Sequence, residues 1–243
     1  MNIPVFLNSY NRLTWLKDMV EELWRFDGVE SIYIVDNDSA YPPLLDYLSA
    51  IENGEARTLV PVRVVRLAHN DGPRGAYHEA KRILTLDIDG EGWKHFAVMD
   101  PDLDLSELPN DFFLRCAAAL DMYPDINKVG PSLHIDDLPE DSLIGERVKS
   151  FEEKYWTNKR DKYWFEADID THAFVMRVDD GFSYGPGLRS LCSARHLPWY
   201  LTIETLSDED IYYLKSLPPE HASGIYWSTL LRDDHLLQPL KNH

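Results

Sequence analysis

The first 104 residues alternate short apolar runs with amphipathic segments, and this alternation limits the possible folds more than any other feature. Between the runs lie segments whose apolar residues have helical spacing. The expected strands are residues 3–7, 32–35, 62–67 and the run that ends at Asp100. A strand–helix–strand order predicts parallel pairing with right-handed crossovers. We therefore expect an α/β fold with a mostly parallel central sheet flanked by helices.

The expected helices lie between these strands and again after residue 104. They cover residues 13–28, 42–53, 77–84, 112–120 and 208–217, with Asn11 as a plausible N-cap of the first. Further strands are expected at residues 128–133, 173–178 and 188–194. Residues 136–168 are charged and aromatic without a clear period. We expect one domain over residues 1–243, with an elaborated second half.

A pair of carboxylates follows the fourth expected strand, where Pro101 ends the run and separates Asp100 from Asp102. Open α/β sheets bind ligands at the carboxyl ends of their strands, and two such acids can hold Mg²⁺ or Mn²⁺ against an anionic ligand. The spacing alone is uninformative, because Asp-x-Asp also occurs at Asp36/Asp38, Asp87/Asp89, Asp102/Asp104, Asp168/Asp170 and Asp208/Asp210. The buried strand before Asp100 favours a metal site over solvated turn acids.

Charge and composition exclude several classes of protein. The formal net charge of -18, from 42 acidic and 24 basic residues, argues against non-specific binding to nucleic acid or an anionic membrane. No apolar stretch is long enough to cross a bilayer, so we expect no transmembrane segment. The amino terminus lacks a secretory pattern, and Cys116 and Cys192 do not indicate a disulfide framework. We expect a cytoplasmic protein.

The loop residues favour a nucleotide-diphosphate ligand held through a metal. The first loop, residues 8–12, has no glycine, which argues against a dinucleotide-binding Rossmann site. Asp36 or Asp38 could accept hydrogen bonds from a base or ribose, and Arg74 could meet the pyrophosphate. A turn and helix cap is an equal alternative for the two acids. For Arg74 the alternative is a solvated charge at the start of a helix.

Four loop motifs follow the first four expected strands in turn: Asn8-Ser9-Tyr10-Asn11-Arg12, Asp36-Asn37-Asp38-Ser39, Asn70-Asp71-Gly72-Pro73-Arg74 and Asp100-Pro101-Asp102. These motifs, in this order along the chain, resemble those of family 2 glycosyltransferases with a GT-A (nucleotide-diphospho-sugar transferase) fold. The resemblance implies that the sugar-nucleotide donor contacts Asn8, Tyr10, Arg12, Asp36, Asp38, Asn70, Gly72, Arg74 and Asp100. It implies Mn²⁺ or Mg²⁺ as cofactor, with Asp100, Asp102 and His196 as ligands; an ordinary core histidine is the alternative for His196.

The resemblance divides the chain into a nucleotide-binding half, residues 1–104, and an acceptor-side half, residues 105–243. It implies transfer of a sugar to a hydroxyl of a glycan, a lipid-linked molecule or another acceptor. An inverting enzyme needs a general base, and the candidates are Asp210 and Glu209 at the start of the last helix, with Asp170 and Glu204 as rivals. Ordinary acids of a helix N-terminus are an equal alternative for the first two.

Two other functions remain open from the sequence. Asp100 could be the nucleophile of an aspartyl-phosphate phosphatase, although such a strand normally lies near the amino terminus. The chain could also be a non-catalytic protein that binds a sugar nucleotide or a glycan.

Overall fold

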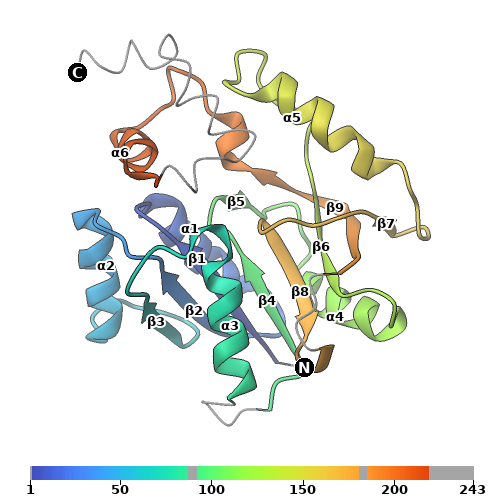
Figure 1. Ribbon diagram of the computed structural model, residues 1–243, viewed down its shortest axis with the longest axis horizontal. Coiled ribbons are helices and arrows are strands. Elements are labelled where there is room, and N and C mark those ends of the chain that lie inside the picture. The colour runs from blue at the N-terminus through green and yellow to red at the C-terminus, as the bar shows by residue number, and fades with distance from the viewer. Residues whose placement is uncertain (1, 87–91, 181–184, 219–243) are drawn as a thin grey trace.

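The computed structural model describes residues 2–86, 92–180 and 185–218. In these residues a nine-stranded sheet has the order β3-β2-β1-β4-β8-β6-β9-β5, and β7 also pairs with β9 (Figure 1). The strands are β1 (Ile3–Ser9), β2 (Val29–Asp36), β3 (Val62–Arg66), β4 (His95–Met99), β5 (Leu103–Asp104), β6 (Lys128–Leu133), β7 (Trp164–Glu166), β8 (Ala173–Arg177) and β9 (Gly187–His196). The α-helices are α1 (Thr14–Glu22), α2 (Pro42–Glu52), α3 (Gly75–Thr85), α4 (Phe112–Met122), α5 (Gly145–Glu152) and α6 (Asp208–Ser216). None of these helices is long and apolar enough to span a membrane.

The sheet is parallel in its first half and mixed in its second. β1 pairs in parallel with β2 and β4, and β2 pairs in parallel with β3. β8 is antiparallel to both β4 and β6. The α/β prediction is therefore confirmed, but the expectation of a mostly parallel sheet holds only for the first four strands. The reason lies in the register, because Ala173 pairs with Met99 and the chain thus enters β8 at the carboxyl end of β4.

Alternating residues of the strands face two separate hydrophobic cores, as the period of two in a strand requires. On β1, Val5 and Leu7 face a core to which α1, α2 and α4 contribute. Phe6 faces the opposite core, which α3 covers and where its ring stacks on Tyr33. Helices cover both faces of the sheet, and α5 and α6 lie at its edge opposite the N-terminus (Figure 1).

Two local expectations were wrong. Residues 136–168 contain a helix, α5, and a short strand, β7, where the sequence indicated irregular structure. Asn11 does not cap α1, because its backbone is left-handed (φ 48°) and its side-chain oxygen accepts from the N–H groups of Ala40, at 2.7 Å, and Tyr41. Asn11 therefore ties the loop after β1 to the loop after β2.

Candidate functional site

A cavity of ≈ 700 Å³ lies where the loops after β1, β2, β3 and β4 meet residues of the second half. Because parallel strands end at one edge of a sheet, residues distant in sequence come together here. The lining from the first half includes Asn8, Tyr10, Arg12, Asn37, Asn70, Gly72, Asp100 and Asp102. The lining from the second half includes Glu152, Tyr155, Asp168, Asp170, His172, Arg189, His196, Trp199 and Tyr213.

Asp100 lies beside two other carboxylates. Its Oδ2 accepts a hydrogen bond from the Thr171 hydroxyl at 3.0 Å, and its backbone N–H donates to the carbonyl oxygen of His172 at 2.9 Å. Burial raises the pKa of Asp100 well above its usual value, and the charges of Asp102 and Asp170 raise it further. A cation between Asp100 and Asp102 would relieve this repulsion.

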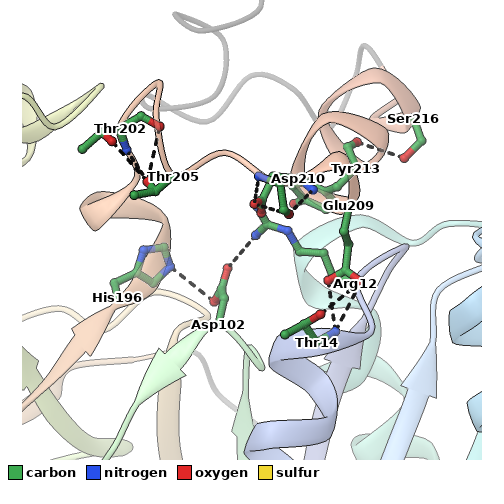
Figure 2. Close-up of polar contacts among 11 residues, drawn as sticks. Arg12, Thr14, Asp102, His196, Thr202, Thr205, Glu209, Asp210, Tyr213 and Ser216 are labelled. Carbon is green, nitrogen blue, oxygen red and sulfur yellow. Dashed lines mark hydrogen bonds and ion pairs between the residues drawn. The ribbon is translucent and has the colours of Figure 1, made fainter. Parts of the chain in front are cut away.

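Asp102 lies between a histidine and an arginine (Figure 2). Its Oδ1 is 3.5 Å from Nε2 of His196, and its Oδ2 is 3.5 Å from Nη1 of Arg12. The β5–β9 pairing creates the first contact, since Leu103 pairs with His196 and the N–H of Leu197 donates to the carbonyl oxygen of Asp102. Burial lowers the pKa of His196, which favours the neutral ring that a metal requires.

The side chains of Asp100, Asp102 and His196 carry atoms that can bind a hard divalent cation. Oδ1 of Asp102 and Nδ1 of His196 are buried without a hydrogen-bond partner. Two carboxylates and an imidazole are suitable ligands for Mn²⁺ or Mg²⁺. Within residues 2–86, 92–180 and 185–218, however, no three Asp, Glu, His or Cys side chains are arranged closely enough to hold a metal ion as they stand.

The loop after β1 holds α6 over one side of the cavity. Arg12 is only 4% exposed, pairs with Asp210 at 3.1 Å and lies 4.0 Å from the centre of the Tyr213 ring. The hydroxyl of Tyr10 donates to the carbonyl oxygen of Ser216 at 2.6 Å. Arg12 thus connects Asp102 to α6, as Figure 2 shows.

Two candidate bases make structural bonds at the start of α6. Asp210 accepts from Arg12 through Oδ1, and through Oδ2 from the backbone and hydroxyl of Ser207, which completes a capping box. The Glu209 carboxylate accepts from the N–H of Thr14 at 3.0 Å, at the beginning of α1. Neither carboxylate lines the cavity, nor does that of Glu204. Asp170, by contrast, is exposed and lines it.

Three predicted donor-binding residues lie outside the cavity lining. Asp36 is buried and pairs with Arg66 on β3 at 3.2 Å, while Asp38 has a left-handed backbone (φ 62°) and an exposed side chain. Arg74 is exposed. The pairing of Asp36 across the sheet is a tertiary contact, which the motif Asp-x-Asp cannot reveal.

After β2, Asn37 lines the cavity, whereas the sequence predicted Asp36 there. Its side-chain nitrogen donates to the carbonyl oxygen of Gly72 at 2.7 Å, and its oxygen accepts from the N–H of Asp71 at 2.8 Å. A Cβ on Gly75 would lie 2.9 Å from that oxygen, so only glycine leaves Asn37 in this position. In the sequence, the glycines of the turn at residues 70–75 are the feature that could have indicated this close approach of Asn37.

In the part of the cavity lining that comes from the second half of the chain, the sequence did not reveal a group of polar residues. Nη1 of Arg189 contacts Oε2 of Glu152 at 2.5 Å, and both side chains are buried. The Arg189 guanidinium also lies 4.1 Å from the centre of the Tyr155 ring. Glu152 ends α5, the helix that the sequence did not predict, so this pair could not be located in advance.

No family model and no curated protein matches the chain. Solved structures that resemble it include mannosyltransferase PcManGT from Pyrobaculum calidifontis in complex with GDP-Man and Mn²⁺, with a TM-score of 0.45, 15% identity and coverage of 72% of this chain. Another is a mycobacterial protein, with a TM-score of 0.38, 13% identity and coverage of 73% of this chain. The matches cover 44% and 54% of those two solved chains, so this chain spans about half their length.

Proposed function

We propose that this protein is a metal-dependent glycosyltransferase, which moves a sugar from a nucleotide-diphosphate donor to an acceptor hydroxyl. The observation that carries the proposal is the cavity itself, in which Asp100 and Asp102 lie between polar loops of the first half and Asp170 of the second. Two substrates can thus meet on either side of one acidic centre. The donor would bind to residues 1–104 and the acceptor to residues 105–243.

The donor-binding side is built from neutral amides and one buried cation. We assign Asn8, Tyr10, Asn70 and Gly72 to the nucleoside, together with Asn37 in place of Asp36. Arg12 lines the cavity 3.5 Å from Asp102, which supports its assignment to the diphosphate. Because Asp38 and Arg74 are exposed outside this lining, we give them no direct contact.

Asp100 and Asp102, with His196, are the residues that would hold Mn²⁺ or Mg²⁺. When bound, the metal offsets the negative charge on the departing diphosphate. Burial and then the charge of Asp102 raise the pKa of Asp100, and a cation bound by both carboxylates would favour their charged forms. The pairing of β5 with β9 holds His196 beside Asp102.

In the transfer itself, the bond between the anomeric carbon and the diphosphate oxygen breaks, and its electron pair stays on the diphosphate. The acceptor oxygen forms the new bond to that carbon and loses its proton. If the enzyme inverts, Asp170 is our candidate base, because its exposed carboxylate lines the cavity while Asp210 and Glu209 make structural bonds.

The experiment is to incubate the protein and Mn²⁺ with UDP-, GDP-, ADP-, CDP- and dTDP-sugars and measure release of nucleoside diphosphate, with water as the acceptor of the sugar. We expect release from one class of donor, reduced at least about 100-fold in Asp170→Asn if this residue is the base. The control is Asp104→Asn, which removes an acid outside the cavity lining. Hydrolysis of p-nitrophenyl phosphate without use of any sugar nucleotide would instead indicate the phosphatase, and binding without turnover would indicate a binding protein.

A further inference from the structure

The side chain of His172 has an unused hydrogen-bonding atom at the wall of the cavity. It directly precedes β8, is 5% exposed and lines the cavity. Its ring bonds to the backbone of Pro131, and since proline has no N–H, the ring donates to the carbonyl oxygen. Nε2 is buried without a hydrogen-bond partner, so Nδ1 makes that bond. Nε2 therefore holds a lone pair that the protein does not use.

A buried polar atom without a partner is costly, and a ligand that donates a hydrogen bond would remove this cost. In a neutral imidazole whose Nδ1 carries the proton, Nε2 is an acceptor. The missing partner is therefore a donor group such as a hydroxyl.

The position of His172 links it to the reaction centre. Its carbonyl oxygen accepts from the N–H of Asp100 at 2.9 Å, and Thr171, its neighbour, donates to the Asp100 carboxylate at 3.0 Å. Asp170 lines the same cavity two residues earlier. His172 therefore lines the same cavity as the central acids and the candidate base.

Charges around His172 disfavour an anionic acceptor. Arg189 contacts Glu152 at 2.5 Å and donates to the carbonyl oxygen of Asp168 at 2.8 Å. Lys128 is likewise bonded to the Asp168 carboxylate, at 3.1 Å. The charges of these two pairs offset each other, and the exposed carboxylate of Asp170 adds one further negative charge to this wall of the cavity.

We propose that His172 binds the acceptor substrate, by accepting a hydrogen bond at Nε2 from a hydroxyl of an uncharged polyhydroxyl compound. The inference rests on the proposed transferase function and names the substrate class of its acceptor side. The rings of Tyr155 and Trp199 line the same cavity. His172 is thus a specificity-determining residue.

The test uses saturation-transfer NMR with the full chain and two probes that differ at one carbon, methyl α-D-glucopyranoside and its C6 carboxylate, methyl α-D-glucuronide. Methyl mannoside and galactoside extend the neutral set. We expect a neutral glycoside to bind and the glucuronide not to bind. His172→Phe should weaken that binding about tenfold, as loss of one buried hydrogen bond predicts. His172→Gln, which can place an oxygen near Nε2, should restore part of it.

The control is His134→Gln, since His134 bonds to Glu107 at 3.0 Å and does not line the cavity. Nucleoside-diphosphate binding with Mn²⁺ is measured on the same variants and should not change. Binding of the glucuronide, an unaltered affinity in His172→Phe, or no binding of any glycoside would each overturn the proposal. Failure of the transferase function would appear separately, as absence of nucleotide binding in the unmodified chain.

Discussion

At the scale of single residues, the site depends on which acids face the cavity and which are used in packing. Asp36 and Asp210 are both buried in ion pairs with arginines, at 3.2 Å and 3.1 Å. Asp100 and Asp170 instead line the cavity. The spacing Asp-x-Asp does not reveal these tertiary partners. The sequence could locate Asp100 because a buried strand precedes it, but it could not show that Asn37 and not Asp36 faces the cavity.

The raised pKa of Asp100 predicts how stability changes with pH. Its pKa lies above the ordinary value of 3.8, so the folded state binds more protons than the unfolded state between the two values. The contribution of Asp100 to stability is therefore largest at low pH and falls as pH rises through this window. Asp100→Asn should remove that dependence and raise the melting temperature at pH 7, by about 2–4 °C for each kcal/mol gained.

The measurement is thermal unfolding of both proteins from pH 4 to pH 8 without divalent metal. Asp104→Asn is the matched control, since Asp104 is half-buried beside Arg195 and lies outside the cavity lining. If Asp100→Asn shows the same slope with pH as the unaltered chain, our account of this carboxylate is wrong.

At the scale of elements, periodicity predicted most of the regular structure. The strand at residues 128–133 was predicted with its observed bounds, and α2 begins at Pro42 as the sequence indicated. β5 and β7 were missed because they have two and three residues, too few to show a period. The direction of β8 could not be predicted from the sequence either, because it depends on which end of β4 the chain reaches first.

The capping box of α6 gives a prediction at this scale. Ser207→Ala removes the side chain that accepts from the N–H of Asp210 and donates to its carboxylate. We expect a loss of about 1 kcal/mol in the free energy of unfolding, with faster amide exchange in α6. Ser49→Ala, which removes a hydroxyl bonded to the Leu45 carbonyl oxygen inside α2, should be nearly neutral. Equal losses in the two variants would contradict the capping role.

At the scale of the whole molecule, loops of four parallel strands and residues of β9 meet at one edge of the sheet. The sequence predicted the meeting of the first-half loops, because strand–helix alternation requires it. The second half could not be placed in the same way. Its wall of the cavity depends on α5 and on the pairing of β5 with β9, which bring Glu152 and His196 to the cavity. The resemblance pointed to His196, whereas no pattern marked Glu152.

The most direct test of the account is calorimetric titration of nucleoside diphosphates into the protein, with Mn²⁺ and with EDTA. We predict that one diphosphate binds with Mn²⁺ and binds at least about tenfold more weakly without it, because the metal links Asp100 and Asp102 to the phosphates. Asp102→Asn should abolish the difference, whereas Asp104→Asn should retain it. Binding of no diphosphate under either condition, or equal binding by Asp102→Asn and the unaltered chain, would contradict the central claim.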